Sequence, residues 1–166
     1  HFYLEGQVAF VIPKEDKDLL VYSSTQHPSE TQQIIAKMLN QKSNTITVVV
    51  RRIGGGFGGK ETNFLTSSIC AMLANKTKKP VKLRLDRDDD IIITGKRHDF
   101  YSEYEVGFNN LGIIEGVKIK LASRCGMSPD LSVAINERAL LHIDNAYYLS
   151  NVEVQNFLCK TNTATS

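Results

Sequence analysis

A run of five glycines within six residues, 54–59, constrains this chain more than any other feature of its sequence. Residues 45–53, just before the run, are rich in Thr, Val and Ile and predict a strand. Apolar residues at helical spacing predict a helix from about residue 61 to 77. The backbone N–H groups of such a turn, together with the helix dipole, favour an anionic ligand. A plain turn would not need so many glycines, because each one costs conformational entropy.

Two nucleotide-binding motifs overlap this run. Residues 54–60 match GxxxxGK, the P-loop, but Glu61 stands where that motif needs Ser or Thr to ligate magnesium. The same glycines fit the dinucleotide motif GxGxxG, yet Asp86, the candidate ribose-binding acid, follows Gly59 by 27 residues rather than about 20. A P-loop-like or dinucleotide-binding module therefore stays an alternative, as does a non-catalytic assembly domain in which the run is only a corner.

The remaining pattern predicts an α+β fold, a mixed sheet with packed helices. Apolar runs or alternation predict strands, at residues 1–13, 18–24, 45–53, 81–86, 100–108, 117–121 and 146–158. Helical spacing predicts helices, at residues 29–40, 61–77 and 130–142. The first helix should begin with a capping box of Ser29 and Gln32. Turn residues between 109 and 112 predict an antiparallel hairpin, and the charged stretch 86–90 is expected to be a solvated loop.

Composition excludes several classes of function. The net charge is +2 and the charges are interspersed, so neither nucleic acid nor a membrane surface is an expected partner. No apolar stretch reaches the roughly 20 residues that span a bilayer. The three cysteines form no CxxC pair, which predicts reduced, buried thiols in a cytoplasmic protein. His27, His98 and His142 are too dispersed to indicate a metal site.

Several segments follow one another as they do in a known enzyme family, and GGGFGGKE at residues 54–61 is distinctive in itself. The segments are residues 1–5, 24–26, 52–62, 85–90, 93–98, 137–140 and 159–162. They resemble the xanthine dehydrogenase and aldehyde oxidase family of molybdenum hydroxylases. Residues 1–166 are therefore interpreted as a fragment of the molybdopterin-binding domain in a larger subunit, the large subunit of bacterial-type xanthine dehydrogenases.

The resemblance implies a molybdenum-molybdopterin cofactor whose metal is held by the pterin, with no direct protein ligand. In this family water-derived oxygen is inserted into a purine, converting xanthine or hypoxanthine towards urate, while hydride passes to a sulfido ligand of molybdenum. The electrons leave through 2Fe-2S clusters and FAD, expected on a partner iron-sulfur/FAD subunit or on missing parts of the enzyme. A dimer of such heterodimers is the implied assembly.

The resemblance also assigns roles to five residues. Gln26 would hydrogen-bond an oxo ligand of molybdenum, and the backbone amides of Phe57 and Gly58 would approach the cofactor. Glu61 would hydrogen-bond the substrate ring, and Arg138 would stabilise negative charge on a substrate oxygen. Aldehyde oxidases usually carry apolar residues at these last two positions, so both charges favour a purine; an aldehyde-oxidising relative remains the alternative.

The family's general base is a glutamate far downstream, and no position of this chain matches it. It is expected to lie beyond residue 166. The isolated chain is therefore expected to have no hydroxylase activity.

Overall fold

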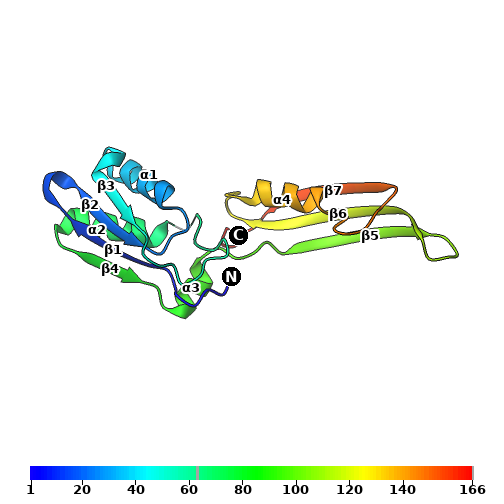
Figure 1. Cartoon of the computed structure of the whole chain (residues 1–166), viewed down its shortest axis with the longest axis horizontal. Coiled ribbons are helices and arrows are strands. Elements are labelled where there is room, and N and C mark those ends of the chain that lie inside the picture. Colours follow the sequence, from blue (N-terminus) through cyan, green and yellow to red (C-terminus); the bar gives the residue numbers. More distant parts are fainter. Residues whose placement is uncertain (63, 166) are drawn as a thin grey trace. The chain divides into compact units, whose positions relative to one another are not determined.

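Alternating apolar residues build a four-stranded sheet in the first part of the chain (Figure 1). The computed structural model describes residues 1–62 and 64–165, and these divide into two compact units, the first ending at Thr94. The strand order is β3-β2-β1-β4, with β2 and β3 parallel and the other pairs antiparallel. The strands are β1 (Val8–Pro13), β2 (Leu19–Ser23), β3 (Ile46–Val49) and β4 (Val81–Arg84). Short 3-10 turns, Glu15–Lys17 and Ser43–Thr45, precede β2 and β3.

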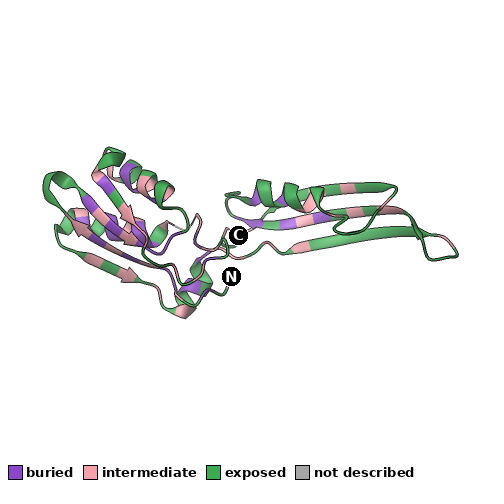
Figure 2. Cartoon of the chain, in the orientation of Figure 1, coloured by how far each residue is buried: buried purple, intermediate pink, exposed green. Residues whose placement is uncertain are grey.

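Two helices, α1 (Pro28–Leu39) and α2 (Leu65–Thr77), cover this sheet and close its core (Figure 2). Val11 and Val21 from the strands and Ile35 from α1 are fully buried there. Cys70 of α2 is buried beside them, and burial raises the pKa of its thiol to about 11. Such a thiol stays protonated and acts as a small apolar side chain.

The second unit contains a three-stranded sheet of order β5-β6-β7. Its elements are β5 (Phe100–Phe108), β6 (Ile114–Gly126), α4 (Ser132–Leu141) and β7 (Val152–Lys160). β5 and β6 form the predicted antiparallel hairpin, and β7 runs parallel to β6. The side chain of Asn109 accepts hydrogen bonds from the N–H groups of Leu111 and Ile113, at 3.0 and 3.1 Å, and so shapes the hairpin turn. α4 packs on β7.

Several local predictions are wrong. Ser29 and Gln32 form no capping box: His27 is the N-cap of α1, and the Gln32 amide donates to the carbonyl oxygen of Ile46, 2.7 Å away. The tertiary contact with β3 replaces the local one. The second helix begins at Leu65 rather than near residue 61. Strands β1 and β7 begin later than expected, and β3 ends at Val49.

The charged stretch 86–90 is also not a solvated loop. It opens a short helix, α3 (Arg87–Ile93), whose N-cap Asp86 accepts a hydrogen bond from the N–H of Asp89 at 2.8 Å. Asp90, on the inner side of this helix, is buried. In a helix, acidic residues that are adjacent in sequence point to different faces, so one of them can be buried while the others are exposed. The consecutive charges in the sequence gave no indication of this difference.

Several apolar side chains of the second unit are exposed. Tyr104 and Phe108 of β5 are exposed to 78% and 70%. Cys159 is exposed as well, whereas Cys125 is buried as predicted. None of the described helices is long and apolar enough to span a lipid bilayer.

Candidate functional site

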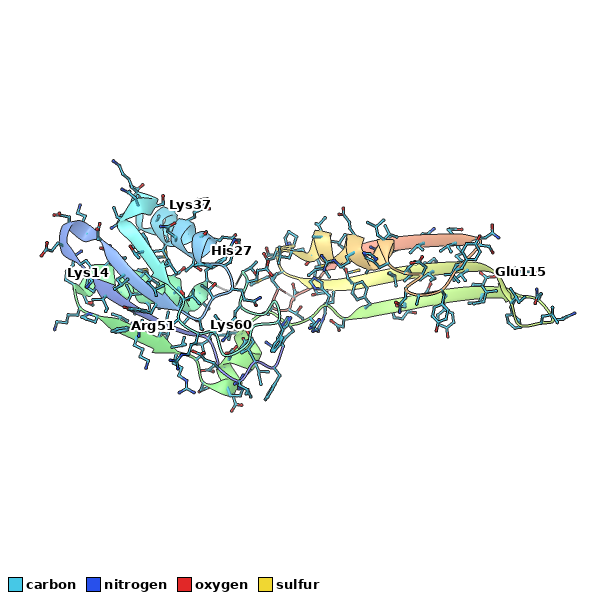
Figure 3. The ribbon with its side chains drawn as sticks, in the orientation of Figure 1. Lys14, His27, Lys37, Arg51, Lys60 and Glu115 are labelled. Atoms are coloured by element: carbon cyan, nitrogen blue, oxygen red, sulfur yellow. The ribbon has the colours of Figure 1, made fainter. Side chains whose placement is uncertain are left out.

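Gln26 and the glycine run are joined by reciprocal hydrogen bonds. Gln26 follows β2, and its backbone N–H donates to the carbonyl oxygen of Lys60 at 2.9 Å. Its side-chain oxygen, Oε1, accepts from the N–H of Gly58 at 2.9 Å and from the N–H of Lys60 at 3.3 Å. Figure 3 marks Lys60, in the loop after β3, and His27, the residue after Gln26. Segments 32 residues apart therefore form one structure.

The orientation of the Gln26 amide follows from these bonds. Two N–H donors converge on one atom, and only the carbonyl oxygen of an amide can accept both. The amino group, Nε2, consequently points away from Gly58, and no described residue accepts a hydrogen bond from it. Because Gln26 is exposed, its Nε2 is a fixed donor available to a ligand.

Gly56 lies against the Gln26 side chain, and a Cβ atom there would stand 2.3 Å from Oε1 and 2.6 Å from Cδ. The Gly56→Ala substitution should therefore displace the Gln26 side chain and release its two hydrogen bonds. We expect amide exchange at Gly58 and Lys60 to rise about tenfold, measured by nuclear magnetic resonance. Gly116→Ala is the matched control, since a Cβ atom at Gly116 meets nothing within 4 Å. Unchanged exchange in Gly56→Ala would contradict the contact.

Phe57, at the tip of the run, adopts φ 55° and is 66% exposed. A left-handed conformation costs a residue with a Cβ atom roughly 1–2 kcal/mol. Its N–H has no acceptor among the residues that the structure describes, whereas the N–H of Gly58 is already bonded to Gln26. A strained, exposed aromatic residue is typical of a functional turn rather than of a core position.

Lys60 does not serve as a P-loop lysine. A P-loop needs its ammonium group on a phosphate, but the Lys60 side chain is 0% exposed and its Nζ donates to the carbonyl oxygen of Ile53. Nζ also lies 4.7 Å from the centre of the Tyr3 ring. Burial lowers the pKa of Lys60, while the nearby Glu5 and Asp90 carboxylates partly oppose that shift. The P-loop interpretation is therefore wrong.

The dinucleotide interpretation also fails. It requires a parallel βαβ unit with an acid at the end of its second strand. β3 and β4, the strands before and after α2, lie at opposite edges of the sheet rather than side by side, and Asp86 caps α3. Moreover, α2 begins only at Leu65, whereas the run ends at Gly59, so the run does not open directly into a helix N-terminus.

The two remaining predicted residues lie in different units. Glu61 is half-buried next to the run, and its N–H donates to the carbonyl oxygen of Gly58 at 3.3 Å. Arg138 is exposed on α4 in the second unit. Within the described part of the chain, neither side chain forms a salt bridge. The structure therefore gathers Gln26, Phe57, Gly58 and Glu61 at one turn and places Arg138 on a separate helix.

Sequence reasoning missed a buried polar cluster behind the run, which consists of Tyr3, Gln7, Lys60, Asp90 and Thr94. A usable signal was present, because Asp86 and Asp89 have the spacing of a helix N-cap and its partner, which would have predicted α3. In the described residues, no group of three or more His, Cys, Asp and Glu side chains could hold a metal ion.

Comparison with known proteins identifies the family. Residues 1–166 match the family model of the molybdopterin cofactor-binding domain. Curated relatives include xanthine dehydrogenase/oxidase from Gallus gallus, 45% identical over 168 residues, and from Mus musculus, 47% identical over 164. The alignments cover 100% and 98% of this chain, but the chain spans only 12% of either relative's length. Xanthine dehydrogenase from Dictyostelium discoideum is 45% identical over 163 residues.

Solved structures share the fold. Aldehyde oxidoreductase from Desulfovibrio gigas superposes with a TM-score of 0.87 at 20% identity, over 100% of this chain and 18% of that one. Quinoline 2-oxidoreductase from Pseudomonas putida 86 gives 0.84 at 19% identity, over 98% of this chain and 21% of that one. The predicted α+β class is thereby confirmed. The chain belongs to the molybdopterin cofactor-binding domain family, as a molybdopterin-binding segment of the xanthine dehydrogenase kind.

Proposed function

We propose that this chain forms one wall of the molybdenum site in a purine-hydroxylating oxidoreductase, and that it acts as part of a larger protein. The observation that carries the proposal is the Gln26 amide, whose oxygen is held by two backbone N–H groups and whose Nε2 is left as an exposed donor. An uncharged donor can hydrogen-bond an oxygen on the metal without ligating the metal itself.

The described residues fit a metal that is held by its pterin. That fit depends on hydrogen-bond donors at the glycine run. Gln26 would orient the group through Nε2, and Phe57 would offer an unpaired backbone N–H beside it. The molybdenum-pterin group, when bound, supplies the two-electron redox chemistry. The residues of this chain supply orientation and fixed dipoles.

Glu61 and Arg138 are proposed to bind the purine. The Glu61 carboxylate would accept a hydrogen bond from a ring N–H group of the purine. The Arg138 guanidinium would face the substrate oxygen on which negative charge develops, and such an interaction is strong where water is excluded. Neither side chain is committed to a described salt-bridge partner. The relatives at 45% identity are named xanthine dehydrogenases, which supports a purine over an aldehyde.

The remaining parts of the proposed enzyme lie outside this chain. The general-base glutamate would come from another segment of the protein. Electrons would leave through 2Fe-2S clusters and FAD, on a partner subunit or another domain, in an assembly of paired heterodimers. A cytoplasmic location would suit such an enzyme, which uses soluble substrates.

The test is the molybdenum and pterin content of the complete protein, purified with its partner subunit from a cell that makes the cofactor. We expect about one molybdenum per chain, because a cofactor of this kind is bound stoichiometrically. The sample should also bind neither ATP nor NAD through Lys60 or Asp86. Absence of both molybdenum and pterin would refute the proposal and leave an assembly role for the glycine run.

A further inference from the structure

Asp90 lies at the centre of the buried polar cluster behind the glycine run. Its side chain is 2% exposed and accepts hydrogen bonds from Tyr3 and Gln7. The Tyr3 hydroxyl donates to Oδ1 at 2.5 Å, and the backbone N–H of Gln7 donates to Oδ2 at 2.7 Å. The Thr94 hydroxyl lies 3.1 Å from Oδ1, but it donates its single proton to the closer backbone carbonyl oxygen of Asp90. A buried carboxylate with a donor on each oxygen is held in one position, since moving it would leave these polar groups unpaired.

Two routes connect this carboxylate to the glycine run. In the first, the Gln7 side-chain amide donates to the Tyr3 hydroxyl and to the carbonyl oxygen of Gly59, both at 3.1 Å. In the second, the Lys60 ammonium lies on the Tyr3 ring and donates to the carbonyl oxygen of Ile53. The residue before the run and the residues at its end are therefore fastened to the same cluster.

Charge compensation explains why the cluster tolerates burial. Asp90 is attracted to Lys60, which is buried nearby, and Arg87 on α3 adds a second positive charge. Arg87 also donates to the carbonyl oxygen of Leu4 at 2.6 Å, which holds the segment that carries Tyr3. Neutralising Asp90 would remove one of the two carboxylates, Glu5 and Asp90, that offset the burial of the Lys60 ammonium group.

We propose that Asp90 is a positioning residue for the glycine run: acting through Tyr3 and Gln7, it holds Gly59 and Lys60 so that the Gly58 and Lys60 N–H groups stay on Gln26. Two residues therefore hold the run: Gln26, which contacts it directly, and Asp90, which acts on it through Tyr3 and Gln7. The consequence for the cofactor rests on the proposed function, but the anchoring itself does not.

The test uses the complete protein with the Asp90→Asn substitution, followed by amide hydrogen exchange and mass spectrometry. Asn keeps the shape but offers one acceptor oxygen, so either Tyr3 or Gln7 loses its acceptor. We expect exchange across residues 56–60 to accelerate about tenfold, with exchange in β1 and β2 changing less than twofold. Asp88→Asn, on the exposed side of the same helix, is the matched control and should leave both regions unchanged.

Tyr3→Phe provides a milder second variant, because it removes only the hydroxyl and keeps the ring beneath Lys60. It should also accelerate exchange across residues 56–60. The inference is overturned if neither variant changes that segment, or if the acceleration is equal in β1 and β2, since that pattern means general destabilisation.

Molybdenum retention during dialysis separates this inference from the proposed function. If the wild type holds molybdenum, Asp90→Asn should release it several-fold faster, because the run that faces the cofactor is loosened. If amide exchange across residues 56–60 changes in Asp90→Asn but molybdenum retention does not, the link between Asp90 and the cofactor is overturned. A wild type without molybdenum would refute the proposed function, while the exchange pattern would still decide whether Asp90 anchors the run.

Discussion

Replacing Gln26 with Glu should lower the kcat of the complete enzyme about 100-fold while leaving the glycine run ordered. A carboxylate at this position still accepts from the N–H groups of Gly58 and Lys60, which Oε1 now does at 2.9 and 3.3 Å. It cannot donate, however, so the outward Nε2 donor is replaced by a negatively charged oxygen. The substitution therefore separates anchoring of the run from donation to a ligand.

Steady-state kinetics with xanthine would measure the proposed donation by Gln26, and amide exchange across residues 56–60 would measure its anchoring of the run. Gln33→Glu is the matched control, because Gln33 is exposed on α1 and undergoes the same change of charge. Gln26→Ala should lose both functions, giving low activity and fast exchange. Normal turnover by Gln26→Glu would show that the donor has no part in the reaction.

Replacing Arg138 with Met should lower kcat/KM for xanthine by about 100-fold or more. The substitution removes the positive charge that is proposed to stabilise the negative charge developing on the substrate oxygen. The free energy of unfolding should change by less than about 0.5 kcal/mol, because the side chain is exposed and forms no salt bridge with a described residue. Substrate kinetics and thermal unfolding of the complete enzyme would test both expectations.

An aldehyde substrate is the internal control for Arg138→Met, since an aldehyde has no second oxygen, corresponding to an exocyclic oxygen of xanthine, for the guanidinium group to stabilise. Its turnover should fall much less than that of xanthine. Arg138→Lys should be intermediate, because lysine keeps the charge but not the planar fork of donors. Intact xanthine turnover in Arg138→Met would remove this residue from the substrate site.

Local sequence patterns predicted most of the elements. Period-two alternation gave β4, β5 and β6, and the turn chemistry around Asn109 gave the hairpin that joins the last two. Helical spacing gave α1, α2 and α4, with errors confined to their ends. Such patterns predict individual elements well because the spacing of apolar residues depends on which face of that one helix or strand is buried.

Errors arose where a partner distant in sequence decided the outcome. Gln32 suited a capping box, but Ile46 offers its side chain a carbonyl oxygen. Lys60 suited a phosphate, but Ile53 and Tyr3 hold its ammonium group inside the protein. In both cases the residue type was compatible with two partners, and only the folded chain brought one of them within reach.

The sequence by itself determined the α+β class and the special turn, because these depend on periodicity and on a glycine motif that is continuous along the chain. Gln26 and Glu61 became candidates only through the resemblance to a known family. Only the tertiary structure decided the direction of the Gln26 amide and the burial of Asp90. Each depends on atoms contributed by segments 32 to 87 residues apart. Hydrogen bonds between residues so far apart in sequence form only when the chain folds, and a local sequence pattern cannot predict them.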